Sequence, residues 1–367
     1  MAQVTKEQLK EVIENFQYNG EVLASKAFGS GHINDTFLLT LDTEEKIVLQ
    51  RLNRSVFLKL EELMENVMKV TSHVRNKVIE AGGNPTRETI NIVLAKNGKP
   101  YYIDSKKDFW RTYIYVGDAS CYDRVENPEH FYQSGVAFGN FQKQLSDYPA
   151  ETLHETIEGF HDTKARFAVF KKAVEEDVMG RAASVQEEIK FVLKREDVAN
   201  YFTELLEAGE LPLRVTHNDT KLNNVLIDNA TGKGICVLDL DTVMPGLAMH
   251  DFGDAIRFGA STAAEDEKDL SKVSCSMELF ELFTKGFIEG CAGGLTEREI
   301  ELLPMGAKSM TYECGMRFLT DYLQGDTYFK VHREGHNLDR CRTQFKLVKD
   351  MEEKWEIMQS IVRKYSK

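Results

Sequence analysis

Residues 212–241 read PLRVTHNDTKLNNVLIDNATGKGICVLDLD, and this stretch decides the fold of the chain. Three short apolar runs with the composition of β-strands lie within it, at 213–215, 225–227 and 235–238. The loop between the first two runs is too polar for a protein core and too varied in functional groups for an ordinary turn. Asp219 and Asn224 lie in this loop, five residues apart, and Asp239 follows fifteen residues later, just after the third run. The pattern therefore predicts a functional loop.

The order of a carboxylate, an amide and a second carboxylate is the one that phosphoryl transfer requires. One carboxylate orients the attacking hydroxyl and accepts its proton, while the amide oxygen and the second carboxylate hold Mg²⁺ against the nucleotide phosphates. Protein kinases have the same spacing, in H-R-D-L-x-x-x-N and a later metal-binding aspartate. We predict Asp219 as the catalytic base and Asn224 and Asp239 as Mg²⁺ ligands, with ATP as the donor. Asp241 is a further candidate metal ligand, and His217 is expected to brace the loop.

The same stretch resembles the catalytic loop of the aminoglycoside phosphotransferase and choline kinase superfamily. Three wider phrases, HNDTKLNNVL at 217–226, LDLDTVMPG at 238–246 and DFGDAIR at 251–257, resemble the bacterial N-acetylhexosamine 1-kinases. This resemblance implies a bilobal, protein-kinase-like α+β fold. A small lobe with an antiparallel sheet is expected at 1–118, and a larger, mainly helical lobe at 119–367. It also implies that the anomeric hydroxyl of N-acetylglucosamine or N-acetylgalactosamine is the acceptor, whereas the spacing alone indicates a kinase for a small hydroxyl compound.

A glycine-bearing loop is expected between two antiparallel strands near the N-terminus, at 21–28 and 36–41. Backbone N–H groups of such a loop can bind phosphate oxygens, and the candidates are Gly29, Ser30 and Gly31. A plain hairpin turn is the alternative. His32 and Asn34 in the same loop carry groups that can face a substrate hydroxyl or a phosphate.

The third expected strand, 46–52, differs from that of protein kinases, which carry a phosphate-binding lysine there. This strand offers Gln50 and Arg51, and strand alternation lets only one of them face the cleft. Arg51 is our candidate, although the sequence does not fix the register. A later strand ends at Tyr115 and Val116, where kinase-like folds place the hinge whose backbone binds adenine.

The chain is expected to be helical after Pro128, with helices that include 184–207, 270–287, 297–323 and 345–364. Three residues in this half are candidates for binding the sugar, namely Phe258, Arg317 and Tyr328. Phe258 would stack on the sugar ring, with a place in the core as the alternative. Asp251 lies 27 residues after Asn224, too far along to be the metal-binding aspartate, and is expected to brace the loop.

Composition limits the other classes of function. The net charge of −13 argues against nucleic acid as the main partner. Because the chain lacks an apolar signal region and any run of about eighteen apolar residues, we expect a cytoplasmic protein without a membrane segment. The six scattered cysteines fit free thiols in a reducing compartment. We expect a monomer.

Alternative functions remain open from the sequence. Within the kinases, choline, homoserine or an aminoglycoside could be the acceptor. From another class, a catalytically inactive kinase fold could serve as a binding module. The presence of the base, the amide and the metal-binding carboxylate disfavours the inactive module.

Overall fold

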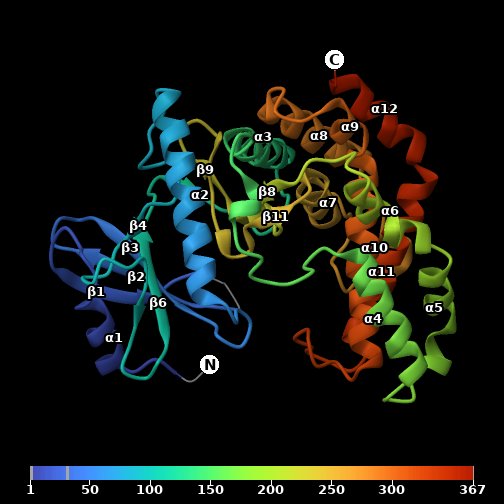
Figure 1. The fold of residues 1–367 in the computed structure, drawn as a ribbon, viewed down its shortest axis with the longest axis horizontal. Helices are drawn as coiled ribbons and strands as arrows, with labels where there is room; N and C mark the ends of the chain where they lie inside the picture. The colour runs from blue at the N-terminus through green and yellow to red at the C-terminus, as the bar shows by residue number, and fades with distance from the viewer. Residues whose placement is uncertain (1–2, 30–32, 367) are drawn as a thin grey trace.

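The computed structural model describes residues 3–29 and 33–366. It consists of two lobes side by side, a smaller one built on a β-sheet and a larger one built mainly of helices (Figure 1). This is the predicted α+β architecture. Within the described residues, no helix has both the length and the apolar character needed to cross a bilayer.

The N-terminal lobe is built on one antiparallel sheet with the order β1-β2-β3-β6-β4, and β5 also pairs with β6. Its strands are β1 (Val22–Ala27), β2 (Asp35–Leu41), β3 (Lys46–Leu52), β4 (Ile92–Val93), β5 (Tyr102–Ile103) and β6 (Phe109–Ile114). Ile47 and Leu49 of β3 lie in one buried cluster with Val12 of α1 (Lys6–Ile13). Leu52 lies in another cluster with residues of α2 (Leu60–Glu80). Successive residues of β3 therefore face opposite sides of the sheet, one side covered by α1.

The ten α-helices described in the C-terminal lobe are α3 (Pro128–Gln144), α4 (Thr163–Glu176), α5 (Gln186–Leu193), α6 (Glu196–Glu207), α7 (Ala248–Gly259), α8 (Met277–Cys291), α9 (Glu297–Glu301), α10 (Leu303–Leu323), α11 (His336–Glu353) and α12 (Trp355–Tyr365). Helices α3 and α8 approach closely through glycines. A Cβ at Gly139 would lie 2.2 Å from the carbonyl oxygen of Phe287, and one at Gly286 would lie 2.3 Å from that of Tyr132. Larger residues at these positions would force the two helices apart.

Several element boundaries differ from the sequence expectation. The helix expected at 184–207 is two helices, α5 and α6, and the one expected at 297–323 is interrupted before Pro304, at the first turn of α10. The helix expected at 270–287 begins at Met277, where Ser276 caps it, and α11 begins well before residue 345. In the N-terminal lobe, β4 and β5 both pair with β6.

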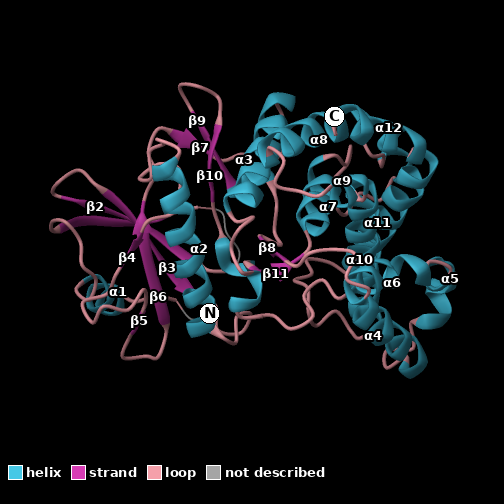
Figure 2. Ribbon diagram, turned by 45° about the horizontal axis from the view of Figure 1, so that its top comes forward, coloured by secondary structure: helices cyan, strands magenta, loops and turns pink. Residues whose placement is uncertain are grey.

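Two small sheets hold the stretch at 212–241 at the boundary of the lobes. Strands β9 (Val225–Asp228) and β10 (Gly234–Val237) pair, and β7 (Ala119–Ser120) joins β9. Strand β8 (Arg214–Thr216) pairs with β11 (Met244–Gly246). Figure 2 shows both sheets between the N-terminal sheet and the large helices. The two pairings place the loop after β8 beside the loop after β10.

Candidate active site

Asp251 of α7 fixes the loop that follows β8. The buried carboxylate of Asp251 accepts hydrogen bonds from the backbone N–H groups of His217 (2.9 Å) and Asn218 (2.8 Å) and from the amide of Gln142 (2.7 Å). Asn218 has φ of +64°, a left-handed conformation that asparagine tolerates better than most residues. The bracing role predicted for Asp251 is confirmed.

His217 connects this loop to the end of β10. Its ring is fully buried, with Nε2 2.7 Å from the carbonyl oxygen of Leu238 and Nδ1 3.2 Å from the backbone nitrogen of Asp219. Because the carbonyl can only accept and the backbone N–H can only donate, Nε2 carries the proton and Nδ1 accepts. The ring is therefore engaged on both sides, and it braces the loop as predicted.

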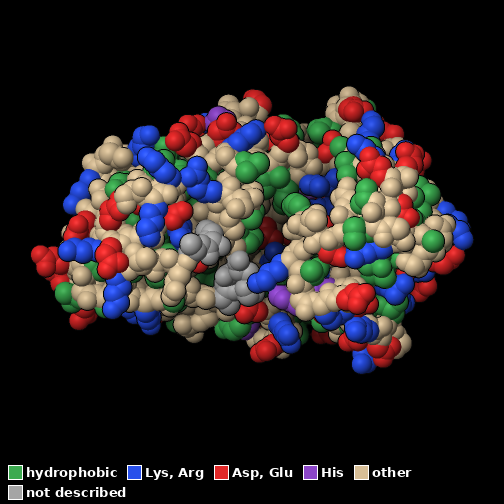
Figure 3. Space-filling view, turned by 90° about the horizontal axis from the view of Figure 1, so that it is seen from below, with side chains coloured by type: hydrophobic (Ala, Val, Ile, Leu, Met, Phe, Trp, Pro, Cys, Tyr) green, Lys and Arg blue, Asp and Glu red, His purple; other side chains and the backbone are tan. Residues whose placement is uncertain are grey.

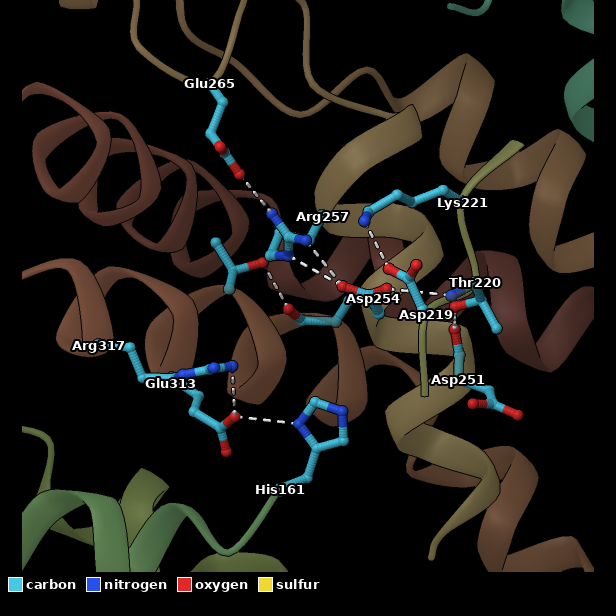
Figure 4. A network of polar contacts seen from close by, with 12 residues as sticks. His161, Asp219, Thr220, Lys221, Asp251, Asp254, Arg257, Glu265, Glu313 and Arg317 are labelled. Atoms are coloured by element: carbon cyan, nitrogen blue, oxygen red, sulfur yellow. Dashed lines mark hydrogen bonds and ion pairs between the residues drawn. The ribbon is translucent and has the colours of Figure 1, made fainter. Parts of the chain in front are cut away.

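Asp219 lies between two polar partners. One carboxylate oxygen is 2.5 Å from Nζ of Lys221, and the other accepts from the amide of Asn224 at 3.2 Å. The same amide donates to the backbone carbonyl of Asp219 at 2.8 Å. Burial lowers the pKa of Lys221, but the carboxylates of Asp219 and Asp254 outweigh it and raise that pKa. Lys221 is therefore charged and forms an ion pair with Asp219 (Figure 4).

Asn224 and Asp239 line one pocket of about 140 Å³ between the lobes. Asp239 follows β10 with φ of +55°. Burial, reinforced by the carboxylates of Asp241 and Asp219, raises the pKa of Asp239 to about 7. The amide nitrogen of Asn224 is used by Asp219, which leaves its oxygen as the group that can bind a cation. Carboxylate and amide oxygens suit Mg²⁺, and a divalent cation would relieve the repulsion at Asp239, so the donor set fits this ion.

The raised pKa of Asp239 gives a testable pH dependence. Its folded-state value of about 7 exceeds the ordinary value of 3.8, so between these pH values the folded protein binds more protons than the unfolded chain. In EDTA, the free energy of unfolding should therefore fall as pH rises from about 4 to about 7, by up to about 4 kcal/mol. Urea unfolding at several pH values, with Asp239→Asn as the control, measures this component. Parallel pH profiles for the two proteins would contradict it.

Asp241 is buried and contacts two residues of the N-terminal lobe. It forms an ion pair with Arg111 of β6 and accepts from the amide of Asn34 at 3.0 Å. The oxygen of Asn34 accepts in turn from the backbone N–H of Asn53 at 3.0 Å. Asn34 thus lies at the boundary of the lobes beside the site. Metal binding by Asp241 stays a prediction, and Arg111 is a functional candidate that the sequence reasoning missed.

The structure corrects the expectation for Arg51. Its guanidinium forms ion pairs with Asp35 and with Asp108, the latter at 2.9 Å, and lies 5.9 Å from the centre of the Trp110 ring. Arg51 shares the α1 face of the sheet with Leu49, whereas Gln50 lines the pocket between the lobes. The pattern of β3 could not indicate this, because apolar residues occupy both faces of the strand.

Of the remaining nucleotide-binding candidates, Gly29 lies shortly after β1, and Tyr115 and Val116 lie directly after β6. Gly29 has φ of +80°, whereas Ser30 and Gly31, together with the substrate candidate His32, lie outside the described residues. Tyr115 donates its backbone N–H to Lys46 at 2.9 Å, and its ring lies 5.7 Å from that of Phe28. Val116 is buried in the cluster that includes α2. Adenine binding by Tyr115 and Val116 stays a prediction.

Two of the candidate sugar-binding residues, Arg317 and Tyr328, contact each other in the C-terminal lobe. Arg317 of α10 donates to the hydroxyl of Tyr328 at 3.3 Å and lies 3.9 Å from the carboxylate of Glu313. Glu313 is buried, and despite that burial the nearby charges of His161 and the arginines lower its pKa to about 2. Its carboxylate is 3.0 Å from Nδ1 of His161. Figure 4 draws this group in the same view as the contacts of Asp219.

Phe258 lies beside Arg257, which belongs to another set of contacts to the catalytic loop. It lines a pocket of about 420 Å³ together with Leu222 and Arg257. Arg257 pairs with Asp254 at 2.8 Å and with Glu265 at 3.0 Å. Asp254 also accepts the backbone N–H of Thr220 at 3.1 Å, which ties this pocket to the catalytic loop. Figure 3 shows the surface hollowed between the lobes, with charged side chains at the edge of the hollow.

A sequence model of the phosphotransferase enzyme family matches residues 25–271. The chain belongs to the phosphotransferase enzyme family. The superfamily predicted from the catalytic loop is therefore confirmed. The match includes the glycine-bearing loop, the catalytic loop and α7, but neither α10, which carries Arg317, nor the segment after it, which carries Tyr328.

Solved structures show that this member of the phosphotransferase family has a kinase-like fold. An aminoglycoside phosphotransferase from Alicyclobacillus acidocaldarius superposes with a TM-score of 0.63 at 11% identity, covering 99% of this chain and 97% of its own. A microcompartment-associated aminopropanol kinase gives 0.58 at 13% identity, with coverage of 96% and 97%. A choline kinase from Cryptosporidium parvum gives 0.56 at 14% identity, with coverage of 92% and 91%. At these identities the likeness concerns the fold alone.

Proposed function

We propose that this phosphotransferase transfers the γ-phosphoryl group of ATP to the anomeric hydroxyl of N-acetylglucosamine or N-acetylgalactosamine. The observation that carries phosphoryl transfer is the arrangement at the lobe boundary. There, Asp219 forms an ion pair with Lys221 and lies beside a pocket that Asn224 and Asp239 share. An amicoumacin kinase of similar fold was solved with AMP-PNP and Ca²⁺, which supports a nucleotide and a divalent cation as ligands here.

In the proposed reaction, Asp219 orients the acceptor hydroxyl and takes its proton late, as the bond to phosphorus forms. Asn224 and Asp239 would hold Mg²⁺, which supplies neutralisation of charge on the β and γ phosphates. His217 and Asp251 fix the loop so that Asp219 needs no reorganisation. Most of the rate enhancement then comes from positioning and electrostatic preorganisation.

The charges near Asp219 support a neutral acceptor over a cationic one. Each carboxylate of the network in Figure 4 at Asp219, Asp254 and Glu313 already contacts a cationic side chain. A choline-like acceptor would need an anionic or aromatic wall to stabilise its charge. A sugar instead needs hydrogen-bond donors and acceptors, which Arg317 and Tyr328 can provide. The choice of an N-acetylhexosamine follows the resemblance of the catalytic phrases.

The proposed function is tested by incubating the purified protein with Mg·ATP and a panel of acceptors. The panel contains N-acetylhexosamines, other hexoses, choline, homoserine and an aminoglycoside, and ADP release is measured. We expect the fastest release with an N-acetylhexosamine and a ³¹P signal from an anomeric phosphate. ADP release with choline and none with sugars would overturn the proposal that an N-acetylhexosamine is the acceptor. Nucleotide binding without turnover of any acceptor would favour the binding module.

Arg317→Met is expected to raise KM for the sugar about tenfold or more while leaving KM for ATP unchanged. The reason is that a hydrogen bond from a charged group is worth about 1.5–3 kcal/mol, and we place Arg317 on the acceptor side only. Initial rates with each substrate varied in turn separate the two constants. Lys330→Met removes one exposed positive charge nearby and serves as the control. An equal rise in both KM values would contradict the assignment.

A further inference from the structure

The phosphates of a nucleotide bring several negative charges into the pocket between the lobes, and β3 provides no cation there. Protein kinases use a lysine of this strand. In this chain, the β3 residue that lines the pocket is Gln50, and Arg51 lies on the opposite face of the sheet. Among the described residues that line the pocket with Asn224 and Asp239, the cationic one is Arg111.

Arg111 lies on the strand next to β3, directly opposite Gln50 in the register of the sheet. Its Nε and one terminal nitrogen donate to the amide oxygen of Gln50, at 2.9 Å and 2.8 Å. Its other terminal nitrogen contacts Asp241. Burial lowers the pKa of Arg111, but the carboxylates of Asp241 and Asp239 raise it more, so the guanidinium is charged.

We propose that Arg111 binds the phosphate oxygens of the nucleotide, and that Asp241 is the partner of its guanidinium when no phosphate is present. Where protein kinases have a phosphate-binding lysine on β3, this chain has Gln50 on β3 and the positive charge of Arg111 on the neighbouring strand β6. This inference rests on the proposed nucleotide-dependent function and names the residue that recognises the phosphates. Arg111 would be a binding residue for the donor and not a proton-transfer group.

The contacts of Arg111 suit a change of partner at one end. Gln50 holds Nε and one terminal nitrogen, so a phosphate oxygen has only to replace Asp241 as the acceptor of the other terminal nitrogen. When a phosphate replaces Asp241 as the partner of Arg111, the carboxylate of Asp241 still accepts the hydrogen bond from Asn34. A planar guanidinium can hold Gln50 and a phosphate at the same time because its five N–H groups point in fixed, different directions.

The test compares ADP with adenosine in EDTA by titration calorimetry, because the two ligands differ in the phosphates and not in the base. Arg111→Met should weaken ADP binding about tenfold or more, since a charged hydrogen bond to phosphate is lost, and leave adenosine binding unchanged. Arg111→Lys keeps the charge and should retain most of the ADP affinity. Lys96→Met removes an exposed charge from the same lobe and should change neither affinity.

Asp241→Asn tests the second half of the proposal. If Asp241 competes with phosphate for Arg111, this variant should bind metal-free ADP more tightly, the opposite of Arg111→Met. A purely structural ion pair predicts that both variants weaken the binding of ADP and of adenosine alike, and that result would overturn the proposal.

Unchanged ADP affinity in a folded Arg111→Met protein would also overturn it. If that variant does not fold, the ADP affinities of Arg111→Lys and Asp241→Asn decide between the two outcomes. Because no acceptor is present, failure here is distinguishable from failure of the acceptor panel.

Discussion

Asp219→Asn is expected to lower kcat about 10²- to 10⁴-fold while KM for ATP and the melting temperature change little. Asparagine has the shape of aspartate and keeps an oxygen for the amide of Asn224, but it cannot accept the proton of the acceptor hydroxyl. It also removes the charge partner of Lys221, so the oxygen that orients the hydroxyl is held less firmly. Steady-state kinetics with saturating sugar, together with thermal unfolding, measure both parts of this prediction.

A matched control for Asp219→Asn is Asp269→Asn, which removes an exposed carboxylate of the same lobe and should leave kcat unchanged. A second comparison uses Asp251→Asn. Asp251 acts through the backbone of His217 and Asn218, so this variant should lower kcat and the melting temperature together. Near-full turnover in Asp219→Asn would show that another group takes the proton, and the assignment of the base would then be wrong.

The catalytic loop could be predicted from the sequence because its geometry is local. The spacing from Asp219 to Asn224 fits one loop between β8 and β9, and Asp239 follows the strand that pairs with β9. Short strands that pair as neighbours leave little freedom in where their ends lie. The same reasoning placed β3 and most helices, since each depends on periodicity within a single segment.

The position of Arg111, the cation that we propose for phosphate binding, could not be predicted, because it depends on two strands at once. Arg111 faces Gln50 only through the register between β3 and β6, and no pattern within either strand fixes that register. The contact between Glu313 and His161 is similar, since these residues lie 152 positions apart on α10 and a loop before α4. Polar contacts between distant segments depend on the tertiary fold, which spacing along one segment does not encode.

Asp239→Asn is expected to lower kcat/KM about 10²- to 10³-fold, because a bound metal ion supplies several kcal/mol of charge stabilisation in the transition state and this variant loses a ligand. The same change should raise the melting temperature of the metal-free protein above pH 7. There the carboxylate of Asp239 is ionised, buried and close to Asp219 and Asp241, so its removal relieves repulsion in the folded state. Activity and stability should therefore move in opposite directions.

Kinetics over a range of Mg²⁺ concentrations and thermal unfolding in EDTA test this pair of effects. Excess Mg²⁺ should restore part of the activity of Asp239→Asn if the loss reflects weakened metal binding, whereas it should not restore Asp219→Asn. The wild-type melting temperature should rise on adding Mg²⁺, and that of Asp239→Asn should rise less, because the ion binds the folded state through this carboxylate. A destabilised variant with normal turnover would place the metal elsewhere and leave Asp239 as a structural residue.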